Sequence, residues 1–219
     1  MEALKAVIVS VVIIVSHGCA HAQDDIFGKD RLFDGRLIIG SNITQVDGDT
    51  YYGFNKVGLH VGAQVYVHFS KMFGAGMELL YAQKGARGGV VKESYTVGTY
   101  IDKYYLNLNY AEVPVTLHFK PNPFWDFEVG AAYARLISSK EWAESDVPVQ
   151  IRPEWNSFDK SEISYLCGAS RRVYKRWEGG IRLQYSARAI RPRERVPLRY
   201  TEYTGQYSHV FCIRMAYIL

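Results

Sequence analysis

The sequence predicts an all-β fold: an eight-stranded antiparallel up-and-down barrel that crosses a membrane. Beyond residue 34, stretches in which apolar and polar residues alternate with a period of two recur along the chain. Such alternation is typical of strands whose two faces meet different environments. The links between these stretches are alternately short and long, as in transmembrane barrels. The composition agrees, because Tyr, a residue common in strands and at membrane interfaces, occurs 17 times.

The first residues have the pattern of an export signal. Lys5 precedes an apolar run over 6–15, and Ala20 and Ala22 supply small residues before Gln23. We therefore expect a cleaved signal peptide over 1–22, a short periplasmic segment over 23–33 and a barrel domain over 34–219. The run is shorter than the roughly 20 apolar residues that a membrane anchor needs. Cys19 leaves lipidation of the chain as an alternative.

Eight stretches are expected to form the strands. In the stretch 57–69, apolar residues such as Val57, Leu59 and Val61 occupy one face, whereas His60 and Gln64 lie on the other. Each stretch is close to the roughly 10 residues that a tilted strand needs to cross a bilayer. The eight stretches are 36–45, 57–69, 73–84, 105–120, 127–138, 160–172, 181–188 and 211–219.

The links between the strands predict the orientation of the barrel. Links 70–72, 121–123 and 174–176 are short, whereas 46–52, 85–103, 140–159 and 189–199 are longer. Outer-membrane barrels place short turns and both termini in the periplasm and longer loops outside the cell. Aromatic residues flank the short turns, as in an interfacial girdle. A second belt is expected near the long links from Tyr51, Tyr52, Tyr81, Tyr104, Tyr105, Tyr200 and Tyr203.

Charged side chains on the polar faces predict what fills the barrel. These residues lie opposite the aliphatic face of their strands, so a transmembrane barrel turns them inward. Buried charges must be paired, and an eight-stranded barrel is just narrow enough for side chains to fill it. We therefore expect an interior of paired Glu and Arg and no open pore. The predicted interior charges are Glu78, Glu112, Glu128, Glu162, Arg182, Arg188 and Arg214.

Several short segments, in this order and spacing, resemble a known family. They are 46–49, 52–56, 58–62, 78–85, 108–115 and 128–130. Together they resemble the PorT-like outer-membrane β-barrel family of Gram-negative bacteria. The resemblance implies an eight-stranded barrel made with a signal peptide. Some members of that family assist protein secretion or gliding, so the resemblance also implies an accessory role in export.

The sequence predicts no enzyme, no cofactor and no metal centre. None of the standard nucleotide, metalloprotease or hydrolase motifs occurs in it. Asp47 and Asp49 flank Gly48, but two acids are too few for a calcium site, and a turn is expected. Ser208 and His209 are adjacent in a strand, so they point to opposite faces and cannot form a dyad.

Three further residues carry structural expectations. Cys167 and Cys212 fall on strands two places apart, beyond disulfide reach, and are expected to be free thiols. Pro114 lies within a predicted strand and removes a hydrogen-bond donor, so a bulge is expected there.

The expected partners follow from the charges and the membrane location. The formal net charge of +4 is too small to indicate nucleic-acid binding. Outer-membrane lipid is the expected surrounding, and an arginine-rich link is a candidate contact for lipopolysaccharide phosphates or for proteins of a secretion or surface complex. That link contains Arg191, Arg193, Arg195 and Arg199.

The predicted function is therefore a structural or accessory role in the cell outer membrane. Two alternatives stay open at this point. In the first alternative, the chain is an exported, soluble, lipocalin-like binder of a small apolar ligand. In the second, it is a narrow channel. The first alternative requires apolar side chains inside the barrel and polar side chains outside it, and the second requires an open interior.

Overall fold

The computed structural model describes residues 32–48, 53–94, 98–145, 157–196 and 205–219. The predicted signal peptide and Cys19 lie outside the described residues, as do Asp49 and Arg199. Residues Asp34–Leu219 form one compact unit.

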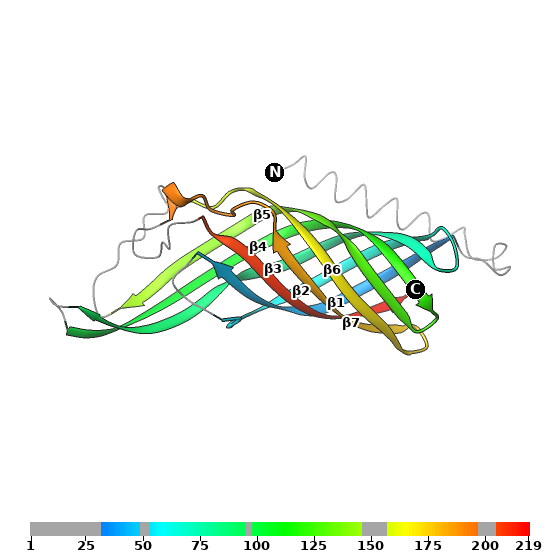
Figure 1. Ribbon diagram of the computed structural model, residues 1–219, viewed down its shortest axis with the longest axis horizontal. Coiled ribbons are helices and arrows are strands. Elements are labelled where there is room, and N and C mark those ends of the chain that lie inside the picture. Colours follow the sequence, from blue (N-terminus) through cyan, green and yellow to red (C-terminus); the bar gives the residue numbers. More distant parts are fainter. Residues whose placement is uncertain (1–31, 49–52, 95–97, 146–156, 197–204) are drawn as a thin grey trace. The chain divides into compact units, whose positions relative to one another are not determined.

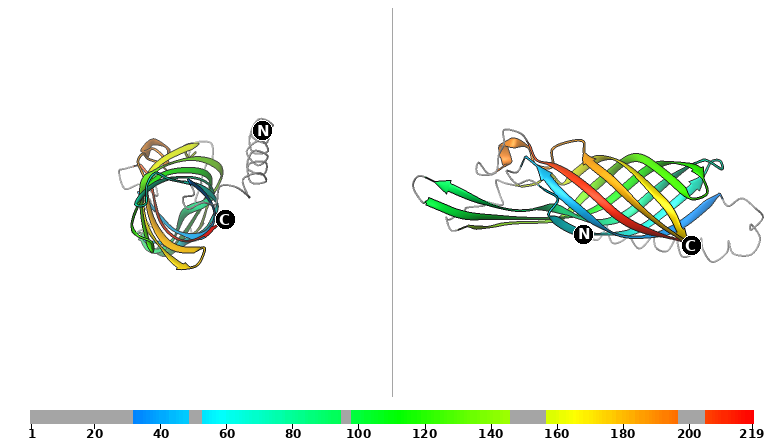
Figure 2. Two further views of the ribbon diagram at one scale, coloured as in Figure 1. Left: turned by 90° about the vertical axis from the view of Figure 1, so that its right-hand side faces the viewer. Right: turned by 60° about the horizontal axis from the view of Figure 1, so that its bottom comes forward.

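Eight strands form a closed antiparallel barrel in which neighbours along the chain are neighbours in the sheet and β8 pairs with β1. The predicted fold class is confirmed, and Figure 2 shows the closed ring from one end. A 3₁₀ helix, η1, lies between the last two strands at Arg193–Arg195. The strands are β1 (Phe33–Asp47), β2 (Lys56–His68), β3 (Phe73–Ser94), β4 (Gly98–Asn122), β5 (Trp125–Ser145), β6 (Ser161–Tyr174), β7 (Trp177–Ser186) and β8 (Tyr207–Ile218).

The short turns lie at one end of the barrel, together with the end of β8. Two residues, Lys175 and Arg176, separate β6 from β7, and Lys175 adopts a positive φ of 37° in that turn. The backbone N–H of Ile218 donates to the carbonyl of Arg176 over 2.9 Å. The chain therefore finishes beside this turn, as expected for an up-and-down barrel.

Strands β3, β4 and β5 continue well past the other strands at the opposite end (Figure 1). The predicted links 85–103 and 140–159 are wrong in this respect, because strand pairing continues to Ser94 and Ser145. Gly85, with a φ of 140°, breaks the alternation, and a Cβ there would lie 2.0 Å from the carbonyl oxygen of Leu106. Strand pairing nevertheless continues because its inner face is buried, with Leu106 and Leu108 fully covered.

The outward face of the barrel is apolar over most of its height. Side chains that alternate with the buried positions are exposed aliphatic residues on all eight strands, so the barrel presents a continuous apolar belt to its surroundings. This belt includes Leu37, Ile39, Leu59, Val65, Met77, Leu79, Val115, Leu117, Val129, Ile163, Leu183, Ile213 and Met215. Among the described residues, no helix is long and apolar enough to cross a membrane.

Aromatic side chains border this belt at the end with the short turns. Phe69 and Phe73 flank the β2–β3 turn, and Phe124 and Trp125 flank the next short turn, all of them exposed. At the other end, the prediction of an outward Tyr104 is wrong, because this side chain is fully buried inside the barrel. Tyr51, Tyr52, Tyr200 and Tyr203 lie outside the described residues.

Pro114 does not produce the predicted bulge. The β3–β4 register is the same on both sides of it, with Met77 opposite Val115 and Leu80 opposite Glu112. The missing N–H therefore interrupts the ladder locally without inserting a residue. The β4–β5 register shifts instead between Asn109 and Tyr110.

Cys167 and Cys212 are free, as predicted, and they also point to opposite faces. Cys167 is exposed on the outer face of β6, whereas Cys212 is buried in the interior on β8. Neither thiol therefore forms a disulfide that cross-links the barrel.

The connectivity predicts which residues a reagent outside the cell reaches. After Cys167 and Cys212 are replaced, Arg193→Cys should react with a membrane-impermeant maleimide on intact cells, because η1 lies at the end with the long links. Lys175→Cys, in a short turn, should react only once the outer membrane is permeabilised. The reverse pattern would contradict this orientation.

Candidate functional site

The candidate site is the charged interior of the barrel. Six of the seven predicted interior charges point into the barrel and are almost completely buried. They do not lie together in one group but form two layers along the barrel axis, and a third layer of charges lies nearer the short turns. Each layer joins residues far apart in the sequence.

Two carboxylates and two guanidinium groups form the middle layer. Arg182 donates to both carboxylate oxygens of Glu78 over 2.8 Å, and its Nε donates to Glu128 over 2.8 Å. Arg214 donates to Glu78 over 2.9 Å and to Glu128 over 2.8 Å. Charges balance in this layer, and its four residues come from β3, β5, β7 and β8. Such charge-assisted, bidentate hydrogen bonds suit buried ion pairs because they satisfy several donors at once.

Glycines in the wall leave room for this layer. A Cβ added to Gly168 on β6 would lie 2.6 Å from Glu128 Oε1 and 2.7 Å from the carbonyl oxygen of Ile181. A Cβ added to Gly76 on β3 would lie 2.5 Å from Gln64 Nε2. Gln64 itself donates to Glu78 over 3.0 Å. Small residues in the wall therefore allow large polar side chains to fill the centre.

The next layer lies toward the end with the long links. Lys84 contacts both Glu112 and Glu162, with Nζ to oxygen distances of 2.8 and 2.9 Å. Gln184 donates to Glu112 over 3.0 Å and to Ser164 over 2.7 Å. Lys84 was not among the predicted interior charges, although its spacing of six residues from Glu78 places both on the same face of β3.

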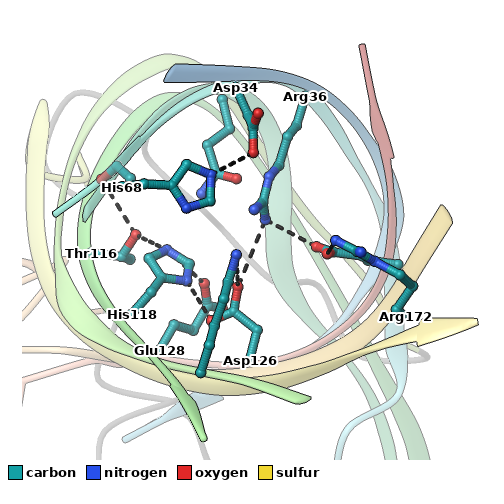
Figure 3. A network of polar contacts seen from close by, with 12 residues as sticks. Asp34, Arg36, His68, Thr116, His118, Asp126, Glu128 and Arg172 are labelled. Atoms are coloured by element: carbon teal, nitrogen blue, oxygen red, sulfur yellow. Dashed lines mark hydrogen bonds and ion pairs between the residues drawn. The ribbon is translucent and has the colours of Figure 1, made fainter. Parts of the chain in front are cut away.

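The third layer lies near the short turns, and Figure 3 shows it from close by. Arg36 donates to Glu178 over 3.0 Å and lies 3.8 Å from Asp126. His118 hydrogen-bonds with Asp126 over 2.9 Å, and His68 hydrogen-bonds with Asp34 over 2.6 Å. This layer could not be predicted from the sequence, because its residues lie at strand ends, where the alternation of apolar and polar residues is short.

Within the third layer, Asp126, His118 and Thr116 follow the order of a hydrolase triad. Nδ1 of His118 lies 2.9 Å from Asp126, and Nε2 lies 2.8 Å from Thr116 Oγ1 (Figure 3). A nucleophile must reach its substrate, however, and Thr116 is only 1% exposed. Its hydroxyl also donates to the carbonyl of Gly76 over 3.3 Å. In this arrangement the three side chains form a buried hydrogen-bond chain.

An apolar cluster fills the interior at the extension. Phe158, Ile190 and Val196, from the two links that precede β6 and β8, pack against buried residues of β4 such as Leu106. Above Phe158 lies the guanidinium of Arg191, with Cζ 3.7 Å from the ring centroid. Nonpolar side chains thus occupy the space beyond the charged layers.

Two predictions about arginines are wrong. Arg191, predicted to contact lipopolysaccharide phosphates, is fully buried and ion-paired with Glu141. Burial of this arginine follows from the long β5 strand, which carries Glu141 to the barrel mouth. Arg188, predicted inside, is exposed because β7 already ends at Ser186. The alternation of apolar and polar residues in the sequence continues past the end of the strand, which is why the prediction failed.

The structure also describes the other residues singled out at this end of the barrel. Arg193 is exposed in η1, and Arg195 forms an ion pair with Asp159. Ser208 is buried while His209 lies on the outer face, 2.9 Å from Asp47. No cluster of metal-binding side chains occurs within the described residues.

Removing one member of the middle layer should strongly destabilise the barrel. Arg182→Met leaves two buried carboxylates with one cation, a change that typically costs about 3–5 kcal/mol. Arg188→Met, at an exposed position, should change the free energy of unfolding by less than about 0.5 kcal/mol. Urea unfolding followed by tryptophan fluorescence in one detergent compares the two; equal losses would contradict the layer's importance.

The wall glycines allow a finer test. Gly168→Ala should destabilise the barrel by about 1–3 kcal/mol, because the new methyl group overlaps Glu128 and the neighbouring backbone. Gly179→Ala is the matched control, since its Cβ would meet only a Val173 methyl group at 3.3 Å. The same unfolding assay measures both, and a Gly168→Ala barrel as stable as the control would show that the interior has spare room.

Comparison with known proteins agrees with this architecture. A family model described as an outer membrane protein beta-barrel domain matches residues 33–189. No curated protein matches the chain. Ail of Yersinia pestis is 12% identical, with a TM-score of 0.46 over 86% of this chain and 100% of Ail. OprG of Pseudomonas aeruginosa is 10% identical, with a TM-score of 0.41 over 89% and 99%. Because the family model covers most of the chain, the protein belongs to the family of outer-membrane β-barrel domains.

Proposed function

We propose that this outer-membrane barrel is a closed structural or accessory component of the cell surface, neither a pore nor an enzyme. The observation that carries the proposal is the middle layer, in which Arg182 and Arg214 bridge Glu78 and Glu128 across the interior. Side chains that cross the interior leave a solute little space. Catalysis also needs an accessible reactive group, and these charged groups are buried and paired.

The accessory role rests on the resemblance to PorT-like proteins, which favours a contribution to protein export or to assembly at the cell surface. The signal-like pattern over 1–22 supports export of the chain. The extension of β3, β4 and β5 supports a role outside the membrane, because it presents strand surface beyond the apolar belt.

The two alternatives fit the observed faces less well. A lipocalin-like binder needs an apolar cavity inside and a polar surface outside, whereas this barrel has exposed Leu79 and Leu117 and buried Glu78 and Arg182. A narrow channel needs a continuous aqueous path, and the three charged layers and the apolar cluster all lie across the interior.

Lipid contact is part of the proposal. The apolar belt fits acyl chains, and Arg193 and Arg195 remain at the end with the long links, where lipopolysaccharide phosphates are expected. Arg191 is removed from this set by its pairing with Glu141.

Planar bilayer recordings test the closed interior. The refolded barrel, verified by a different gel mobility before and after boiling, should add no steady conductance to the bilayer. A large porin refolded in the same way is the positive control. Reproducible single-channel steps from the purified barrel would contradict the proposal and favour the narrow channel.

Cell fractionation and co-purification test the remaining parts. The protein should be recovered from the outer-membrane fraction only with detergent, and residues 1–22 should be absent from the mature chain. Recovery as a soluble periplasmic protein would favour the lipocalin-like alternative. A stable complex with components of an export machine would support the accessory role, whereas isolation of the barrel alone under gentle detergent would count against it.

A further inference from the structure

The outer face of the extension changes character above the apolar belt. Along β4, outward positions are apolar from Leu117 to Ala111 and then become Asn109 and Asn107. On β5, Tyr133 is followed outward by Arg135, and beyond the exposed Ile137 at the register shift the outward residues are Ser138 and Lys140. This change marks the outer boundary of the hydrocarbon region. Residues farther out on the extension therefore face the headgroup layer and the space above it.

An aromatic pair reappears beyond this polar zone. Tyr105 on β4 and Trp142 on β5 are cross-strand partners, and their rings stack at 5.1 Å with an interplanar angle of 10°. Trp142 remains 41% exposed. Tyr105 lies four residues beyond Asn109, which corresponds to about 10 Å along the barrel axis for a tilted strand. The pair is therefore too far from the hydrocarbon to act as an interfacial girdle.

Positive charge surrounds the pair. The guanidinium of Arg87 on β3 lies over the Tyr105 ring, with Cζ 5.2 Å from its centroid. Lys103 and Lys140 are exposed on the same outward face of β4 and β5. Among the side chains that the structure describes on this face, Glu144, opposite Lys103, is the one acidic residue.

We infer that this surface, Arg87, Lys103, Tyr105, Lys140 and Trp142, binds the phosphorylated core saccharide of lipopolysaccharide in the surrounding outer leaflet. Aromatic rings stack on the C–H faces of sugar rings, and Arg and Lys bind phosphate. The height of the pair matches the saccharides that begin directly above the acyl chains. Arg135, exposed at the boundary itself, lies at the level of the innermost phosphates. This inference rests on the proposed placement of the barrel with its extension outside the cell.

A cross-strand aromatic pair also stabilises a sheet without any ligand. The barrel also carries stacked aromatic rings beside an arginine at its other end, although there the two rings come from one strand, β5. At the end with the short turns, Trp125 stacks on Phe127 at 6.0 Å, and Arg171 lies over Trp125 with Cζ 5.6 Å from its centroid. Both ends thus combine stacked rings with an arginine over one ring, but the inference predicts saccharide binding only at the extension.

The test measures binding of deacylated, phosphorylated core oligosaccharide to the folded barrel in detergent by isothermal titration calorimetry. Trp142→Ala and Arg87→Gln should each raise the dissociation constant by about tenfold. Trp125→Ala and Arg171→Gln should leave it unchanged within about twofold. Treatment of the oligosaccharide with phosphatase should weaken binding to the unaltered barrel by a similar factor, because the cations lose their ligand.

Three results would overturn the inference. They are equal binding by the extension variants and their controls, undiminished binding of the phosphatase-treated saccharide, and tighter binding of a sulfated polysaccharide from outside the membrane. Each variant is first checked for heat-dependent gel mobility, and Lys140→Gln provides a second charge variant if Trp142→Ala does not fold. A barrel that stays folded and closed but binds no saccharide would contradict this inference while leaving the proposed closed, structural or accessory role intact.

Discussion

The structure depends on one interaction: the pairing of buried charges across the barrel interior. Arg182, on β7, donates to carboxylates on β3 and β5, so a single guanidinium joins strands that are not neighbours in the sheet. Removing charges from water costs several kcal/mol per ion unless they are paired and hydrogen-bonded. A closed barrel of eight strands brings the partners close enough to meet this condition. Because the paired charges occupy the inward positions of the strands, the apolar side chains that alternate with them face outward.

Filling the interior also determines what the barrel can do. Wall glycines such as Gly168 give the central carboxylates room, and the apolar cluster around Phe158 packs inside the barrel beyond them. On the proposed function, a barrel with a filled interior acts through its outer surfaces. Those surfaces are the apolar belt, which fits lipid, and the extension of β3, β4 and β5, which presents aromatic and cationic groups above it.

Much of the fold could be predicted because the side-chain period of a strand is two, so one charged residue assigns a whole face. Glu78 and Glu128 were found in this way, and Lys84 follows from the same spacing. Arg188 and Arg191 could not be placed, because a strand's end and a link's return into the barrel depend on tertiary contacts such as the Arg191–Glu141 pair. The extension could not be predicted, because the glycines at 85, 88 and 89 interrupt the alternating pattern of β3. Strand pairing there depends on the packing of Leu106 and Leu108, which the sequence pattern does not show.

The most direct test of the central interaction is a double-mutant cycle for Glu78 and Arg182, measured as free energies of unfolding in lipid bilayers. The cycle combines Glu78→Gln, Arg182→Met and the double variant, and so separates the pair's coupling from the effect of each substitution alone. The account predicts a coupling energy of about 2 kcal/mol, because the two side chains share two hydrogen bonds inside the barrel. A coupling energy near zero would contradict it.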